Sequence, residues 1–349
     1  MKAARPLGGA SADPSPGMMA APVHTAHEGG TLVHRALLYR SPEQFTTVAG
    51  RFLQDGVTSG DATVAIVSPA VAEMLRERLG DGAGPVEFVD AGSWYTAPVQ
   101  AMAKYYERTA RDWWPQGRLR VLTEPVWDGR SELEVREWLR HEAVVSRALA
   151  ATPTTMMCAY DAVRLPSGIV AAAARAHPEL ADADTVRPSP RHADPALFYA
   201  ECNAHPLDPP PLSAARRAFA AGELPMLRTF LNAEAARLDL PEEQMLPFVL
   251  AVNEVATVII REGGGYGAVW VWSHDGELVC DITDPGGRLP DHFLGHLPPA
   301  PHQTAEATFW AVRRLCHIVE IRSGEGPDGG VGFRGVDAGT RVRVHMLLR

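Results

Sequence analysis

The sequence predicts an α/β domain built on a parallel sheet, followed by an α+β sandwich. In residues 31–200, short apolar runs without polar alternation are each followed by an amphipathic segment, which is typical of a parallel sheet covered on both faces. A proline-rich linker at 201–215 ends this pattern, and residues 216–349 carry a long helical segment and a hairpin. Residues 1–30 are rich in Ala, Pro, Gly and Ser, which predicts a disordered tail.

The first domain is expected to alternate strands with helices. Ser41 and Pro42 form an N-cap and first-turn signal for its first helix. The predicted strands are 36–39, 62–67, 86–89, 119–123 and 155–160, and the predicted helices are 41–55, 69–79, 98–114, 132–150 and 167–176.

The second domain is expected to place its helices on one face of a mixed sheet. Its central helix has apolar residues three or four apart and ends at the glycines of 263–265. Asp275-Gly276 predicts a hairpin turn between two strands. The predicted helices are 225–238, 242–262 and 305–315, and the predicted strands are 267–272, 277–283, 318–322 and 340–348.

Composition narrows the classes of function. The formal net charge is −9 and no run of Lys and Arg exceeds two residues, which argues against a nucleic-acid partner. Four widely spaced cysteines form no C-x-x-C pair, so reduced thiols are expected. No apolar run reaches the length that spans a bilayer and no signal peptide is evident, so a cytoplasmic protein without membrane contact is predicted.

Several short motifs occur in order along the first domain. They are the opening His34-Arg35-Ala36-Leu37-Leu38-Tyr39, then Glu124-Pro125-Val126-Trp127, His141-Glu142-Ala143, Cys158-Ala159-Tyr160-Asp161 and Ala176-His177-Pro178. Over about residues 30 to 200 the chain resembles the MEDS sensory domain of bacterial regulators. The resemblance implies a RecA-like sheet that senses a ligand in place of phosphate hydrolysis. The sequence also lacks a phosphate-binding P-loop motif.

Polar residues of these motifs are candidates for a small-molecule sensory pocket. They are His34, Glu124, His141, Glu142, Cys158, Tyr160, Asp161 and His177. An alternative is that they support the strand ends by hydrogen bonds. His34, His141, Cys158 and His177 could also meet at the C-terminal ends of the strands as ligands of zinc or haem iron, but their spacing indicates no particular metal. No metal site is therefore predicted.

The central helix of the second domain carries Asn253-Glu254 in its middle. It resembles the N-box of the histidine-kinase and anti-sigma-factor ATPase (GHKL) superfamily, in its actinobacterial version. In that family the Glu orients water or substrate, and an Asn four residues later holds the Mg²⁺ of ATP. Here the later position is Val258, which offers no oxygen ligand.

Other positions of the nucleotide site are partly kept. Asp284-Pro285-Gly286 matches the family's adenine-binding Asp-x-Gly, and Thr340 matches its late Thr. The glycine-rich lid is replaced by Ala305-Glu306-Ala307-Thr308-Phe309-Trp310. The resemblance therefore implies a vestigial site made of Asn253, Glu254, Asp284, Gly286 and Thr340, with little or no binding of ATP and Mg²⁺ and with Glu254 catalytic only if the site is active.

These features together predict a cytoplasmic signalling regulator that needs no cofactor. A sensory domain would control a degenerate anti-sigma-type module, which would bind a sigma factor or an anti-sigma antagonist in transcriptional regulation. Two alternatives stay open. The first is an active ATP-dependent anti-sigma serine kinase, using Glu254 and Asp284, or a histidine-kinase-like ATPase. The second is an enzyme that binds or modifies a small molecule through the first domain. The sequence does not name the signal, the partner or the oligomeric state.

Overall fold

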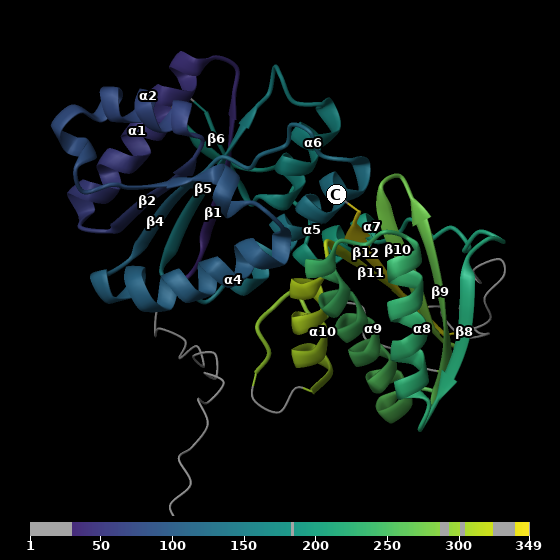
Figure 1. Cartoon of the computed structure of the whole chain (residues 1–349). Coiled ribbons are helices and arrows are strands. Elements are labelled where there is room, and N and C mark those ends of the chain that lie inside the picture. The colour runs from purple at the N-terminus through teal and green to yellow at the C-terminus, as the bar shows by residue number, and fades with distance from the viewer. Residues whose placement is uncertain (1–29, 183–184, 287–292, 301–303, 324–338, 349) are drawn as a thin grey trace, which may run out of the picture.

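The computed structural model describes residues 30–182, 185–286, 293–300, 304–323 and 339–348. Within these ranges the chain forms two units, each a sheet with its own helices (Figure 1). The predicted tail lies outside the described residues except for Gly30.

The first sheet has seven strands in the order β3-β2-β4-β5-β1-β6-β7. All neighbouring pairs are parallel except β6 with β7, so the predicted parallel sheet ends in one antiparallel edge strand that the sequence did not suggest. The strands are β1 (Val33–Tyr39), β2 (Ala62–Val67), β3 (Glu87–Asp90), β4 (Leu119–Thr123), β5 (Thr154–Asp161), β6 (Glu179–Ala181) and β7 (Val186–Pro188).

Helices cover both faces of this sheet (Figure 1). Alternate residues of a strand face opposite sides, so Cys158 faces the core under α5 while Ala159 faces the core under α1. α1 (Pro42–Ser59) and α2 (Pro69–Leu79) lie on one face, and α4 (Pro98–Arg108), α5 (Glu132–Ala148) and α6 (Ser167–Ala176) lie on the other. The helix predicted over 98–114 changes at Thr109 into a π-helical turn.

A capping box sets the start of α5. The Ser131 hydroxyl accepts a hydrogen bond from the Glu134 N–H at 3.2 Å, and the Glu134 carboxylate accepts one from the Ser131 N–H at 2.7 Å. Two of the unpaired N–H groups at the helix start are thereby satisfied. This register places Glu142 toward the first sheet and Arg140 toward the second unit.

The second sheet is antiparallel throughout, in the order β11-β12-β10-β9-β8. The prediction of a mixed sheet is wrong, because β12 lies between β10 and β11 and separates two strands that run the same way. β8 (Ala215–Ala220) was not predicted. The remaining strands are β9 (Tyr266–His274), β10 (Glu277–Asp284), β11 (Ile318–Ser323) and β12 (Thr340–Leu347).

Among the described residues of the second unit, three helices cover one face of the sheet: α8 (Leu224–Arg237), α9 (Glu242–Glu262) and α10 (Thr304–Leu315) (Figure 1). By length and composition α9 could cross a membrane, which differs from the expectation that no apolar run is long enough. Its buried side chains, among them Phe248, Val252 and Val255, belong to the core against the sheet. The core helix of a globular unit passes the same test, so α9 is weak evidence for a membrane span.

A buried polar network joins the two units. Asn203 follows α7 (Pro195–Cys202), and its side-chain oxygen accepts hydrogen bonds from Arg140 at 2.8 Å and from Arg322 at 2.6 Å. Arg140 comes from α5 and also pairs with Glu137, while Arg322 of β11 donates to Glu320 at 3.0 Å. The predicted linker therefore begins inside α7, and its first residues hold α5 against the edge strand of the second sheet.

Candidate functional site

The eight residues predicted for a sensory pocket separate into two places. Glu124 and Asp161 line a surface cleft at the C-terminal ends of the strands. The other six are buried on the α5 side of the first sheet: His34, His141, Glu142, Cys158, Tyr160 and His177. The separation follows from strand geometry, because Cys158 and Tyr160 face the interior whereas Asp161 ends β5.

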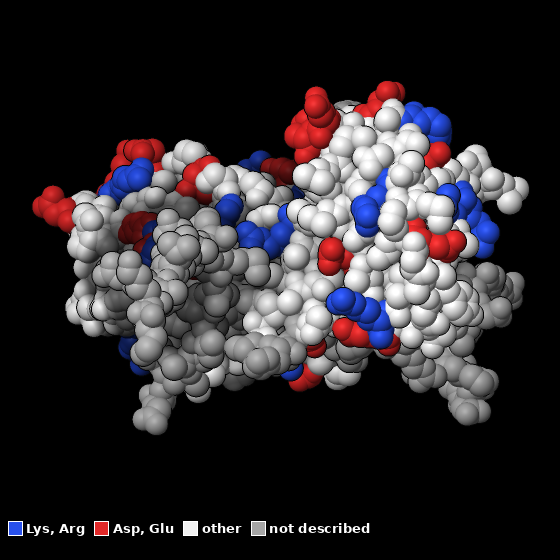
Figure 2. Space-filling view, turned by 60° about the horizontal axis from the view of Figure 1, so that its bottom comes forward, with Lys and Arg blue, Asp and Glu red and all other residues white. Residues whose placement is uncertain are grey.

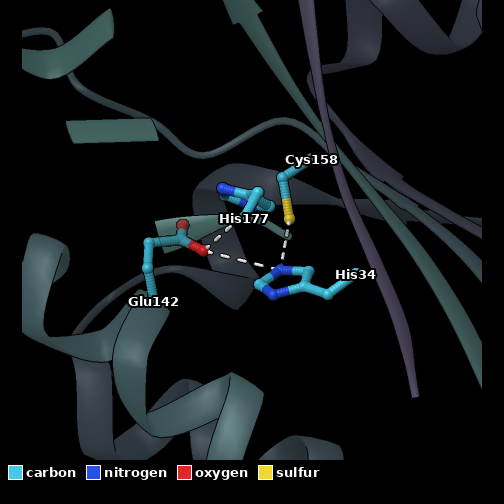
Figure 3. Close-up of side chains that lie close together, drawn as sticks. All are labelled: His34, Glu142, Cys158 and His177. Atoms are coloured by element: carbon cyan, nitrogen blue, oxygen red, sulfur yellow. Dashed lines mark hydrogen bonds and ion pairs between the residues drawn. The ribbon is translucent and has the colours of Figure 1, made fainter. Parts of the chain in front are cut away.

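Four of the buried residues form a compact cluster (Figure 3). His34 Nε2 lies 3.4 Å from Cys158 Sγ and 3.8 Å from Glu142 Oε2, and His177 Nε2 lies 3.6 Å from the same Glu142 oxygen. One candidate ligand atom from each residue lies within 4.8 Å of all the others. The four residues come from β1, β5, α5 and the position that follows α6.

This cluster differs in membership and in place from the set of His34, His141, Cys158 and His177 that the sequence offered as an alternative set of zinc or haem ligands. His141 is not a member; its ring packs on Trp138, with the ring centroids 5.2 Å apart. Glu142, the next residue along α5, takes its place. The cluster lies against the face of the sheet and not at the C-terminal ends of the strands, because His34 is the second residue of β1.

The outer atoms of the cluster are held by neighbouring groups. His34 Nδ1 lies 2.9 Å from Ser146 Oγ, and the Tyr160 hydroxyl donates to Glu142 Oε1 at 3.0 Å. His177 Nδ1 lies 2.8 Å from the Ala173 carbonyl, which can only accept, so Nδ1 carries the proton. The Nε2 atom of neutral His177 therefore presents a lone pair to the cluster.

Burial disfavours the charged form of each of these groups and shifts its pKa accordingly. It raises the pKa of Glu142 to about 7, although the Tyr160 hydrogen bond acts in the opposite sense. It lowers the pKa of His177 to about 4, against the opposing effect of the Ala173 carbonyl, and it holds the pKa of His34 well below its usual value. Burial, with the nearby Glu142 charge, also raises the pKa of the Cys158 thiol. Neutral imidazoles are the form of histidine that binds metals.

The surface cleft has a volume of about 400 Å³ and lies where the chain leaves β2 toward β3 and leaves β4 toward β5. Open α/β sheets bind ligands at such switch points. The Ser68 N–H donates to Glu124 Oε2 at 3.2 Å, which joins the two strand ends. The polar and aromatic lining includes Tyr39, Ser68, Glu124, Trp127, Asp161 and Arg164.

Ser68 and Arg164 were not among the predicted site residues. Ser68 directly follows β2 as Glu124 directly follows β4, so the first residue after each strand was the signal that could have found it. Burial, followed by the charges of Glu124 and Asp161, raises the pKa of Tyr39 to about 12. Its hydroxyl is therefore a protonated donor at neutral pH.

In the second unit, the Asp284 carboxylate accepts hydrogen bonds from backbone N–H groups. It accepts hydrogen bonds from the N–H groups of Gly264 at 3.0 Å and Gly286 at 3.1 Å, and Asp284 is 1% exposed. A Cβ at Gly263 would meet Asp284 Oδ2 at 2.1 Å, so the glycines that end α9 pack directly on this carboxylate. Thr340 pairs with Asp284 across β10 and β12.

Asn253 and Glu254 lie well before this point on α9. Glu254 precedes Gly263 by about 13 Å along the helix axis. Asn253 accepts a hydrogen bond from Arg228 of α8 at 3.0 Å, and Val258 is buried. The structure thus groups Asp284, Gly286 and Thr340, and it places Asn253 and Glu254 together at a separate position.

Comparison with known proteins identifies the first unit. Residues 33–178 match the family model described as MEDS, the methanogen/methylotroph, DcmR sensory domain. The chain contains a MEDS domain. The match runs from the start of β1 to the residue after His177, so it includes the whole buried cluster and both predicted cleft residues.

MEDS is a sensory domain of signalling proteins, which agrees with the predicted role of a signalling regulator. The match stops before the second sheet. No curated protein matches the chain.

Proposed function

We propose that this chain is a cytoplasmic signalling regulator in which the MEDS domain binds a small-molecule signal and controls the second unit. The first unit would be RecA-like and the second a degenerate anti-sigma or histidine-kinase-like ATPase module. That module would act by binding a sigma factor or an anti-sigma antagonist.

The observation that carries the proposal is that α5, a helix of the first unit, contacts both the buried cluster and the second unit. Its Glu142 reaches the buried cluster of the MEDS domain, and its Arg140 donates to Asn203, which also binds Arg322 of β11. Glu134, at the start of the same helix, lies 3.4 Å from His317 of the second unit. A shift of α5 would therefore change contacts with the second unit, directly at His317 and through Asn203 at Arg322.

The cleft at the ends of β2 and β4 suits a small polar organic molecule. Glu124 and Asp161 supply acceptors, the Tyr39 hydroxyl supplies a donor, and Trp127 supplies an apolar wall. A few polar groups among aromatic side chains are typical of small-molecule sites. We propose this cleft as the place where the signal binds.

Protein binding by the second unit is supported by its closed nucleotide positions and by its surface. Asp284 is covered by glycine backbone, and Val258 offers no ligand for Mg²⁺. Leu246 and Leu250, one helical turn apart on α9, are 73% and 42% exposed. Figure 2 shows acidic and basic side chains interspersed over the face it presents, a pattern that suits a protein partner better than a polyanion.

Binding to a panel of purified sigma factors and anti-sigma antagonists from the source organism tests the proposal. Biolayer interferometry with the full chain is expected to detect one partner, and Leu250→Glu is expected to weaken that complex at least about tenfold, as for a buried interface residue. Leu197→Glu on α7, where the leucine is 64% exposed, is the matched control and should leave binding unchanged.

The same measurement separates the alternatives. Binding should not depend on ATP and Mg²⁺. Transfer of the γ-phosphate of ATP to a serine of the partner would favour the kinase alternative, and the absence of binding to every member of the panel would contradict the proposal.

A further inference from the structure

We propose that His34, Glu142, Cys158 and His177 form a four-ligand site for a divalent metal ion, with Zn²⁺ as the ion that fits the donor set best. The inference does not depend on the signal or partner suggested above. It makes the core of the MEDS domain a metal-stabilised structure.

The spacing of the donor atoms fits tetrahedral zinc. Zinc bonds of about 2.0–2.1 Å to nitrogen or oxygen and about 2.3 Å to sulfur place neighbouring ligand atoms about 3.3 to 3.6 Å apart at the corners of a tetrahedron that contains one sulfur. The separations of 3.4 Å for His34–Cys158 and 3.6 Å for His177–Glu142 lie in this range, and that of 3.8 Å for His34–Glu142 is slightly longer. No two of the four ligand atoms are more than 4.8 Å apart, so an inward movement of about 1 Å for the widest pair would close the donors around an ion.

An unpartnered polar atom points into the cluster. His177 is fully buried, its Nδ1 proton is used by the Ala173 carbonyl, and its Nε2 has no hydrogen-bond partner among the described residues. Buried acceptors without partners are rare, because each loses its hydrogen bonds to water and gains none within the protein. A metal ion would satisfy this lone pair.

The outer contacts have the form of a second coordination shell. His34 turns Nδ1 toward Ser146 and Nε2 toward Cys158, and Tyr160 holds the second oxygen of Glu142. Metal-binding histidines usually direct their other ring nitrogen to such a partner, which fixes ring orientation. Both histidines here are held with Nε2 inward.

The charges balance when zinc is bound. Coordination replaces the thiol proton of Cys158, which passes to solvent, and it needs the Glu142 carboxylate in its ionised form. A thiolate and a carboxylate together carry two negative charges, which neutralise Zn²⁺. The loaded site is then electrically neutral, as a fully buried site should be. Four protein ligands leave no open position, so the site is structural in type.

Metal analysis of the untagged full-length chain tests this proposal. After dialysis against ZnCl₂ and then metal-free buffer, plasma mass spectrometry is expected to find one zinc per chain. Cys158→Ala and His177→Ala should each lower zinc affinity, measured by chelator competition, by at least about tenfold. Cys280→Ala removes a cysteine equally buried in the second sheet and should keep the zinc. Equal zinc in Cys158→Ala and wild type would overturn the assignment, as would a wild-type chain that takes up none.

Cobalt spectroscopy keeps the test independent of variant folding. Wild-type protein loaded with CoCl₂ should show the intense visible bands of tetrahedral Co²⁺ together with a thiolate-to-cobalt charge-transfer band. A spectrum of octahedral cobalt without charge transfer would overturn the proposal.

Discussion

His345 of β12 lies on the face of the second sheet opposite its helices, where burial and hydrogen bonds act on its pKa in opposite directions. Its Nδ1 lies 2.8 Å from Glu277 Oε2 and its Nε2 lies 3.4 Å from Glu320 Oε2. Burial lowers the pKa of His345, but the hydrogen bonds to these two carboxylates outweigh burial and raise the pKa above its usual value. His317 lies 4.0 Å from Glu277, and Arg322 and Arg140 lie 3.0 Å and 4.0 Å from Glu320.

The raised pKa of His345 predicts a pH-dependent stability. A group whose pKa is higher in the folded state contributes stability fully below its unfolded pKa of about 6.5 and loses it as the pH rises through the folded value. The free energy of unfolding in urea should therefore fall above neutral pH, and this fall should be smaller in His345→Gln. His274→Gln, at an exposed histidine next in sequence to Asp275, is the control. Identical pH profiles for His345→Gln and wild type would contradict this interpretation.

At the scale of elements, the turns and ends are explained by local chemistry. Asp275 and Gly276 both have positive φ, at 47° and 81°, as the two-residue hairpin between β9 and β10 requires. Gly267 in β9 has another reason to be glycine: a Cβ there would lie 2.3 Å from the Thr283 carbonyl oxygen and 2.6 Å from the Phe219 ring. β9 can therefore approach its neighbours closely only because this side chain is absent.

Gly267→Ala should destabilise the protein because the strand or the Phe219 ring must move. Overpacking of this kind costs about 1–3 kcal/mol. Gly168→Ala, in α6 where a Cβ meets nothing within 4 Å, should instead be neutral or stabilising by up to about 1 kcal/mol. Urea unfolding of both variants measures the difference, and a Gly267→Ala protein as stable as wild type would show that the contact relaxes freely.

At the scale of the whole molecule, buried ion pairs couple the two units. Arg140 is fully buried. It forms an ion pair with Glu137, donates a hydrogen bond to Asn203 and lies 4.0 Å from Glu320 of the second sheet. The ionised form of Glu320 is stabilised by its neighbours. Burial acts to raise its pKa, but the hydrogen bond of His345 and the charges of Arg322 and Arg140 hold the pKa at about 2. Removal of Arg140 or of Glu320 would leave the other residue with a buried charge that is less well compensated.

Arg140→Met should uncouple the two units. Loss of one partner of a buried ion pair costs about 3–5 kcal/mol, so differential scanning calorimetry should show one cooperative transition in the wild-type protein and two separated transitions in the variant. Arg237→Met removes an i,i+3 pair with Glu234 on the surface of α8 and should cost less than about 1 kcal/mol. Two transitions in wild type would mean that the network does not couple the units.

Much of the fold could be predicted because local signals decide it. Ser68 and Pro69 set the start of α2, and the buried run of Ala62–Val67 sets β2. β6, β7 and β8 could not be predicted, since the first two have three residues each and β8 alternates without strong apolar character. Short strands such as β6 and β7, and edge strands such as β7 and β8, depend on their neighbours more than on their own composition.

The sequence by itself determined most helices and strands and the α/β character of the first unit, because periodicity, caps and turn residues act over a few positions, and its short motifs carried the resemblance to the MEDS domain. Only the tertiary structure decided that Glu142 and not His141 joins His34, Cys158 and His177, that Glu124 and Asp161 lie apart from them, and that β12 separates β10 from β11. His34 and Cys158 are 124 positions apart. The sheet register and the rotation of α5 bring them together, and both depend on how whole elements pack.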